Sequence, residues 1–409
     1  MEFLTAKQFA EKLGVTPRRV QDMCRQGAIK GVVRHGREWL IPLTAIEKKE
    51  KNGASVEENH PEAEKSVQAT EKIFNGILDS YKKPGSAAEI LLSLSHDETQ
   101  YDIFASQLAF YRGDHKTALT LAMKYTDDKE TDINIRVAVG MQLTLASLFI
   151  GDYKVWRKGF DYIKATDCKD EYEKHALEFW CATAISSASD EETFPDWFRR
   201  GDFTRLPPNH YPIASYNYVK HLYHACGRIK NKEKTFELLR AMPYVIEPLI
   251  SYACSSGAVI VEIYLRLVCA LAYHLNGNDA VAIPHLDRAI DLALPDKLYT
   301  PLAEYRRRFG FLMDDRVALR SADALADIKS VSKTLIDGWT AIHNEMLGKR
   351  VSSNLSVREW QAARLAAYGL QNKEIADIMG VTVNAVKQAL RMAMDKTGCE
   401  SRDELSQYI

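Results

Sequence analysis

Residues 69–348 limit the possible folds most, because they carry one helical signal after another and almost no strand signal. Apolar side chains recur there at helical spacing, and the turns between them carry Gly-Asp, Asn-Asp or Pro. The chain has 409 residues, of which 46% are hydrophobic and 27% charged, as in an ordinary globular protein of two to four domains. We therefore expect a mainly α protein with a buried core of substantial size.

A loose repeat runs through this middle part. Residues 108–114 end one helix at a Gly-Asp turn that leads into another, and residues 145–152 and 271–277 repeat the arrangement. The glycines of the first two turns lie 38 residues apart, close to the ~34-residue period of helical-hairpin arrays. One hairpin cannot bury its apolar face alone, so stacked hairpins form a continuous core. The pattern resembles a degenerate tetratricopeptide array, which implies an α-solenoid, and residues 286–304 are similar to the last repeat of MalT-like regulators.

The C-terminal segment, residues 352–409, has the capping signals of a compact four-helix unit. Ser356 and Glu359 have the spacing of a capping box at the start of a helix that Gly369 ends. Asn372 is the predicted cap of the second helix, and Thr382 is the predicted cap of the third. The residues expected to face inward from the second helix are Ile375, Ala376 and Met379.

The third of these helices has two contrasting faces. Val386, Leu390 and Ala393 recur at the spacing of a buried stripe. The opposite face carries donors suited to the major groove, where Asn, Gln and Arg pair with base edges and Lys reaches phosphates. The predicted DNA-binding residues of this segment are Lys373, Thr382, Asn384, Lys387, Gln388 and Arg391.

This order and spacing resemble the LuxR-type helix-turn-helix over the whole segment. The resemblance implies binding to double-stranded DNA, with a homodimer on paired half-sites as the expected assembly. At one position the chain departs from the pattern, which usually has His two residues after its Lys, whereas this chain has Ala389. The alternative is an ordinary helical bundle with a polar face.

The N-terminal segment, residues 1–50, shows a second arrangement of this kind. A capped helix begins near Thr5, Thr16-Pro17 starts a second helix, and residues 29–42 alternate around His35-Gly36 as in a hairpin. The segment resembles the winged helix of the MerR/excisionase group, which implies a groove-binding second helix and a wing that touches the DNA backbone. The predicted DNA-binding residues are Arg18, Arg19, Arg25, Arg34 and Arg37. An interaction or dimerisation module remains the alternative.

Charge is distributed unevenly between these segments. Residues 1–51 hold eleven Lys and Arg against six Asp and Glu, and residues 349–409 hold nine against seven. Because the whole chain has a net charge of −1, the part between them carries −8. Two basic ends indicate polyanion contact there. We expect a polar linker at residues 51–68 between the N-terminal unit and the helical domain at 69–348.

Other sequence signals predict the cellular compartment of the protein. The seven cysteines are scattered singly and are expected to be reduced, buried thiols. The N-terminus lacks a signal-peptide layout, and the apolar stretch 258–275 contains charged residues, so we expect a buried helix, no membrane contact and a cytoplasmic protein.

No catalytic motif occurs in the sequence. It contains neither a P-loop, nor a Rossmann glycine pattern after a strand, nor a nucleophile elbow or metalloprotease signature. His221 and His224 are one helical turn apart, which permits a shared metal, but no third ligand lies nearby in sequence, and solvated or packed histidines are favoured. The aromatic run 211–223 favours a core helix over the wall of a ligand pocket. We expect no cofactor, no metal and no enzyme activity.

These observations predict a DNA-binding transcription regulator of bacterial type. Its helical domain is expected to sense a small-molecule or protein effector. The alternative is a tetratricopeptide-like scaffold for protein interactions that carries vestigial DNA-binding modules.

Overall fold

The computed structural model of the chain divides into two compact units, Met1–Val67 and Gln68–Ile409. The described residues of the second unit are 76–126, 132–189, 193–229, 231–349 and 351–408. The described residues of the first unit are 3–5, 7–8, 10, 20–21, 24, 33–35 and 38–42. The predicted linker, 51–68, lies outside the described residues.

The N-terminal unit contains a three-stranded antiparallel sheet. Its strands β1 (Phe3–Thr5), β2 (Val33–His35) and β3 (Glu38–Pro42) lie in the order β1-β3-β2. Strands β2 and β3 pair with His35 opposite Glu38. The sequence predicted a capped helix near Thr5, and the Thr5 hydroxyl does accept a hydrogen bond from the Gln8 backbone N–H at 3.3 Å. The short strand before this cap was not predicted.

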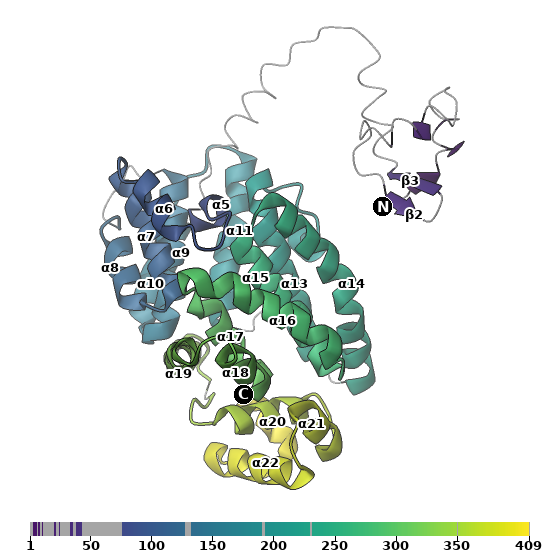
Figure 1. Ribbon diagram of the computed structural model, residues 1–409. Helices are drawn as coiled ribbons and strands as arrows, with labels where there is room; N and C mark the ends of the chain where they lie inside the picture. Colours follow the sequence, from purple (N-terminus) through teal and green to yellow (C-terminus); the bar gives the residue numbers. More distant parts are fainter. Residues whose placement is uncertain are drawn as a thin grey trace, which may run out of the picture. The chain divides into compact units, whose positions relative to one another are not determined.

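The second unit is mainly helical, as the sequence predicted, and Figure 1 shows its helices packed side by side. They are α5 (Ile77–Ser80), α6 (Ala87–Ser93), α7 (Glu98–Arg112), α8 (His115–Met123), α9 (Ile133–Ile150), α10 (Tyr153–Lys164), α11 (Glu171–Ala188), α12 (Asp196–Arg199), α13 (Tyr211–Gly227), α14 (Lys232–Ser256), α15 (Val259–Leu275), α16 (Asp279–Ala293), α17 (Tyr299–Phe309), α18 (Phe311–Ala318) and α19 (Ala322–Leu347). Two 3-10 turns, η1 (Pro208–His210) and η2 (Leu294–Asp296), join neighbouring helices. We call this part, residues 76–349, the helical region.

The Gly-Asp signals of the sequence form tight turns between paired helices. Gly151 ends α9 with a φ of +78°, a left-handed conformation that glycine adopts without a steric penalty. Asp152 then caps α10, because its carboxylate accepts a hydrogen bond from the Val155 N–H at 3.1 Å. The same Gly-Asp device joins α7 to α8. Local sequence therefore fixes both turns.

Helix α15 lies at the centre of the helical region and packs against α13, α14, α16 and α17. All its residues are buried except Arg266 and Tyr273, which are partly exposed. This confirms the predicted buried helix. A different helix, α9, is long and apolar enough to span a membrane, with a mean hydropathy of 1.6, but 78% of it is buried inside the protein. Such burial is typical of a core helix.

Helix α19 crosses the end of α9 at Gly338. A Cβ atom at this position would lie 2.4 Å from the carbonyl oxygen of Leu148, so no other residue permits this crossing without a backbone shift. The close approach brings the middle of α19 against the core.

The cysteines only partly follow the sequence prediction. All seven are free thiols. Cys168 and Cys254 are exposed, however, so the prediction that every cysteine is buried was wrong for these two, and Cys181 is only partly buried. Cys168 lies in the loop before α11, and Cys254 lies two residues before the end of α14, next to the buried Ala253 but on an exposed side of the helix.

The C-terminal segment consists of α20 (Val357–Ala367), α21 (Asn372–Met379), α22 (Val383–Thr397) and the 3-10 turn η3 (Arg402–Gln407). We call residues 351–408 the C-terminal domain. The expected fourth helix is thus a short 3-10 segment. Figure 1 shows the domain against the end of the helical region formed by α17 and α18, and α20 packs on α17.

Candidate nucleic-acid interface

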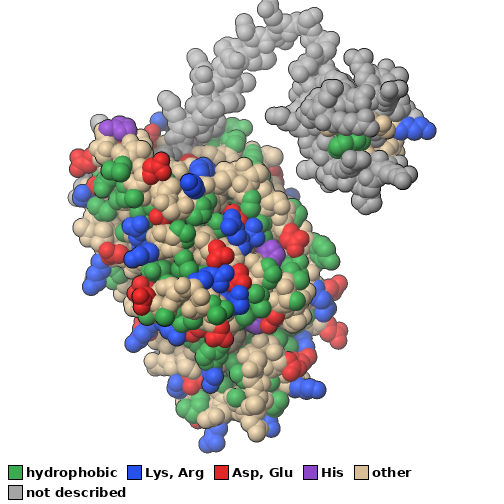
Figure 2. All heavy atoms as spheres, viewed as in Figure 1, with side chains coloured by type: hydrophobic (Ala, Val, Ile, Leu, Met, Phe, Trp, Pro, Cys, Tyr) green, Lys and Arg blue, Asp and Glu red, His purple; other side chains and the backbone are tan. Residues whose placement is uncertain are grey.

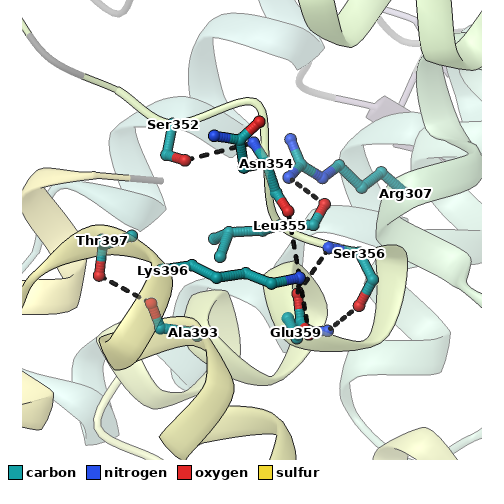
Figure 3. Close-up of polar contacts among 9 residues, drawn as sticks. All are labelled: Arg307, Ser352, Asn354, Leu355, Ser356, Glu359, Ala393, Lys396 and Thr397. Atoms are coloured by element: carbon teal, nitrogen blue, oxygen red, sulfur yellow. Dashed lines mark hydrogen bonds and ion pairs between the residues drawn. The ribbon is translucent and has the colours of Figure 1, made fainter.

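Local capping sets the position of α20, the first helix of the C-terminal domain. The Ser356 hydroxyl accepts a hydrogen bond from the Glu359 N–H at 3.3 Å, and the Ser356 N–H donates to the Glu359 carboxylate at 2.8 Å. This is the capping box that the sequence predicted. Figure 3 shows Lys396 of α22 donating to the same carboxylate, at 2.8 Å. Burial alone would raise the pKa of Glu359, but Lys396 and Ser356 hold it below its usual value.

The start of α21 differs by one residue from the prediction. The cap is Gln371, whose backbone N–H donates to the Glu374 carboxylate at 2.7 Å, and Asn372 is the first helical residue. Asn372 uses its side-chain oxygen to accept a hydrogen bond from Arg402 at 2.9 Å. The prediction of Asn372 as the cap was therefore wrong, because a contact from the far end of the domain engages its amide.

Helix α22 presents the arrangement that the sequence predicted for its third helix. The Thr382 hydroxyl accepts a hydrogen bond from the Ala385 N–H at 3.2 Å and so caps the helix. The residues buried against the rest of the domain are Val386, Leu390 and Ala393. Those exposed on the opposite side are Asn384, Lys387, Gln388 and Arg391, and we call these four the recognition face. In the described part of the chain, none of the four has a hydrogen bond or ion pair to another protein group.

The remaining predicted contacts of this domain lie nearby. Lys373 is exposed on α21, one helix before the recognition face, and Thr382 is exposed at the start of α22. Ala389 is partly buried and packs against the core, so the departure from the LuxR pattern lies at the edge of the packed side. Figure 2 shows Lys and Arg side chains protruding from the end of the molecule that α20–α22 form.

Most of the predicted N-terminal contacts cannot be placed. Arg18, Arg19, Arg25 and Arg37 lie outside the described residues. The backbone of Arg34 lies in β2, opposite Trp39 of β3, while its side chain is outside the described part. Among the described residues of this unit, Ala10, Val20 and Cys24 are buried.

The sequence did not reveal how the C-terminal domain is held against the helical region. Lys232 at the start of α14 donates to both carboxylate oxygens of Glu374 on α21, at 2.6 and 2.7 Å, and this lowers the pKa of Glu374. The guanidinium of Arg358 lies 4.4 Å from the ring centre of Phe311. Because these partners lie far apart in sequence, no spacing pattern could have indicated their contact.

A further anchor lies at the start of the domain. Arg307 of α17 donates to the carbonyl oxygen of Leu355 at 3.2 Å, as drawn in Figure 3, and its guanidinium lies 4.8 Å from the ring centre of Trp360. Gln361 of α20 donates to the carbonyl oxygen of Arg308 at 3.1 Å. Helix α17 therefore holds both the entry and the first helix of the C-terminal domain.

The histidine pair on α13 has aromatic neighbours. His221 lies against the rings of Phe194 and Tyr218, and His224 lies against Tyr223. Within the described residues, a different group has metal-ligand spacing, namely Glu247, Cys269 and His285. Burial raises the pKa of Cys269 to about 12, and Glu247 already accepts a hydrogen bond from Tyr273 at 2.6 Å. The group thus combines an exposed carboxylate, a buried thiol and a partly buried histidine.

Comparison with known protein families bears on both ends of the chain. Residues 353–409 match the family of bacterial regulatory proteins described as the luxR family, and residues 3–48 match a helix-turn-helix domain family. Neither a curated protein nor a solved structure matches this chain. With a luxR-family domain at one end and a second helix-turn-helix domain at the other, the protein is a DNA-binding transcription regulator.

Proposed function

We propose that the protein recognises specific DNA sequences through α22, and that the helical region senses a small-molecule or protein signal. The observation that carries the DNA proposal is the recognition face, four exposed polar side chains on a helix whose other side is buried. A helix whose other side packs against the rest of its domain can enter the major groove and stay folded.

Each of these side chains has a chemistry that suits one kind of contact with DNA. Asn384 and Gln388 carry amides that suit the donor and acceptor edge of adenine, and Arg391 suits guanine. Lys387 and Lys373 provide ammonium groups for phosphates. Thr382 caps α22, which places its hydroxyl at the end of the helix that approaches DNA. Specificity would then come from three side chains, and most of the salt-dependent affinity from two.

The N-terminal domain adds a second DNA contact in this proposal. A winged-helix arrangement there would place Arg18, Arg19 and Arg25 along the groove-binding helix and Arg34 and Arg37 at the wing. Two linked modules raise the effective affinity without new contacts, provided that both can engage at once. We also propose that the protein acts as a homodimer in the cytoplasm and has no enzyme activity.

The test begins with duplexes that the full-length protein selects from fragmented genomic DNA. Their affinity is then measured by fluorescence anisotropy for the wild-type protein and for Lys387→Ala/Arg391→Ala. A good side chain–base contact contributes about 1–3 kcal/mol, so we expect the double variant to bind at least roughly tenfold more weakly. We also expect the slope of the logarithm of the binding constant against the logarithm of the salt concentration to become shallower by about one unit, because one phosphate contact is lost.

The matched control is Lys116→Ala/Lys333→Ala, which removes the same charge from exposed positions on α8 and α19. We expect its affinity to stay close to that of the wild type. Equal losses in the two double variants would show that only net charge matters, and unchanged binding in Lys387→Ala/Arg391→Ala would refute the recognition face. A protein with no duplex affinity even at low salt would instead favour the interaction-scaffold alternative.

A further inference from the structure

The helical region contains a cavity of about 270 Å³. Its walls come from α7, α9, α11, α13, α15, α17 and α19, with one wall from α20 of the C-terminal domain. This volume lies just below the roughly 300–1,000 Å³ of typical ligand pockets, which is room for a small organic molecule. Two residues of the aromatic run that the sequence assigned to the core, Tyr216 and Tyr223, are buried and also line this cavity.

Flat aromatic side chains form much of the wall. Those that define its shape are Phe110, Phe149, Trp180, Tyr216, Trp339 and Trp360. They come from six different helices, so the cavity is a product of the tertiary fold. Aromatic walls favour an occupant with a flat apolar body, because rings pack face to face or edge to face at low entropic cost.

The charged side chains at the wall are predominantly cationic. Lys220, Arg307, Arg308 and Arg364 line the cavity together with a single carboxylate, Glu304. Burial raises the pKa of Glu304 to about 7, so this carboxyl group is partly neutral at physiological pH. The charged side chains that line the cavity therefore carry a net positive charge, which an anion would offset.

Two buried polar atoms at the wall are left without partners. Neither Nε of Arg307 nor the hydroxyl oxygen of Ser332 has a hydrogen-bond partner among the described residues. Burial, and then the neighbouring charge of Arg308, lower the pKa of Arg307 to about 9, and the charge of Asp337 offsets this only in part, which agrees with an incompletely compensated cation. An unpartnered buried donor costs free energy that an acceptor on a ligand would recover.

The DNA-binding part of the chain contributes directly to this cavity. Trp360 and Arg364 of α20 line it, and Arg307 contacts both the ring of Trp360 and the carbonyl of Leu355. Figure 3 shows the Arg307 side chain extending to Leu355, in the segment that leads into α20. An occupant that engages Arg307 therefore touches the residue that anchors the C-terminal domain.

We propose that this cavity binds a small aromatic carboxylic acid, with its ring between the aromatic walls and its carboxylate on Arg307 and the neighbouring cations, and that this binding changes DNA affinity. The inference rests on the proposed sensing function and names its ligand class and site. Because the ligand contacts both parts, it changes how firmly α20 is held. By linkage, DNA then changes ligand affinity by the same factor as the ligand changes DNA affinity.

The first experiment uses the full-length protein and a matched pair of probes, 2-naphthoate and 2-naphthamide. They share a ring system and differ in charge. Binding is followed by calorimetry and by the intrinsic fluorescence of the wall tryptophans. We expect saturable binding of one naphthoate per chain, at least tenfold tighter than naphthamide. Equal affinities for the two probes, or no saturable naphthoate binding at millimolar concentration, would overturn the proposal.

The second experiment locates the site with Arg307→Gln and, as its control, Arg200→Gln, which removes an exposed arginine at the end of α12. We expect at least a tenfold loss of naphthoate affinity only in Arg307→Gln. If that variant unfolds at a lower temperature than the wild type, Ser332→Leu, which fills the cavity, gives an independent test. Retained naphthoate binding in a folded Ser332→Leu protein would place the ligand elsewhere.

The third experiment separates this inference from the proposed DNA function. Naphthoate binding is measured without DNA, and duplex affinity is measured with and without saturating naphthoate. Ligand binding without any duplex affinity would refute the DNA function and leave the cavity assignment intact. Duplex affinity that naphthoate does not change would overturn the coupling, and duplex affinity with no naphthoate binding would overturn the cavity assignment alone.

Discussion

The C-terminal domain and the helical region place their charges in opposite ways. On α22 the cations Lys387 and Arg391 are exposed and have no hydrogen bond or ion pair to another group of the described chain, while the inward side is apolar. Around the cavity, Arg307 and Arg308 point into the interior among aromatic rings. The phosphate backbone of DNA is too large to enter the protein, so the cations that bind it must lie at the surface. A small acid is instead bound best where water is excluded.

In the two proposed functions, one chain uses cations for two purposes. At the surface each ion pair contributes little and is screened by salt, so affinity for DNA depends on several contacts together. In the interior one uncompensated cation has a large effect, because the dielectric is low. Four predictions test or sharpen this difference.

The largest effect is expected for Ile375→Ala, in the small core of the C-terminal domain. Ile375 is fully buried, so its truncation should cost about 2–5 kcal/mol and weaken duplex binding more than naphthoate binding, because α20 forms only one wall of the cavity. Urea unfolding and both binding assays measure this. Ile378→Ala, on the same helix but partly buried, is the control and should cost less. Equal costs would mean that this core is not organised around Ile375.

A smaller effect is expected at the cavity carboxyl group. In the folded protein the pKa of Glu304 is about 7, above the ordinary 4.5, so its contribution to stability is complete below pH ~4.5 and is lost as pH rises through 7. Between pH 5 and pH 8, Glu304→Gln should therefore gain about 1–3 kcal/mol relative to wild type. The groups facing Glu304 are Lys220 on α13, Arg308 on α17, Tyr264 on α15, Tyr111 on α7 and Tyr216 on α13.

Thermal unfolding across this pH range gives the measurement for Glu304→Gln. The exposed Glu345→Gln on α19 is the control, with no expected change in pH dependence. A wild-type protein and a Glu304→Gln variant with parallel pH profiles would show that this carboxyl group is solvated, and the contrast between interior and surface charge would weaken.

The cap of the recognition helix should have a moderate effect. Thr382→Ala removes the hydroxyl that accepts from the Ala385 N–H and should cost about 0.5–2 kcal/mol. Thr382→Asn keeps a capping oxygen and should retain most of the stability. Chemical denaturation gives the free energy of unfolding, and duplex anisotropy shows whether the hydroxyl also contacts DNA. Full duplex affinity in Thr382→Asn together with a loss in Thr382→Ala would assign Thr382 a capping role alone.

The smallest effect is expected at the ion pair that links α14 to α21. Lys232→Ala removes the partner of Glu374, and because both side chains are partly exposed we expect a loss of about 0.2–1 kcal/mol that vanishes at high salt. Lys234→Ala, which removes a neighbouring exposed lysine, is the control. A loss of several kcal/mol for Lys232→Ala would show that docking of the C-terminal domain depends on this surface pair and not on the Arg307 contacts.

Local signals predicted local structure well. Ser356 and Glu359 form the expected capping box, Thr382 caps α22, and the Gly-Asp pairs end one helix and begin the next. Each of these depends on residues within four positions of one another, where spacing alone sets the geometry. Asn372 failed as a cap because Arg402, thirty residues later, engages its amide.

The sequence by itself determined the helical character of the chain, its turns, and the exposed stripe of α22, since helical periodicity decides which side chains share a face. Only the tertiary structure decided that Glu304, Arg307, Ser332 and Trp360 meet around one cavity, and that Lys232 docks the C-terminal domain through Glu374. These residues lie on different helices, and their meeting depends on how helices cross, as at Gly338, where one missing Cβ lets α19 approach α9. Helical periodicity determines which residues share one face of a helix, but the packing of the helices determines which other residues contact that face.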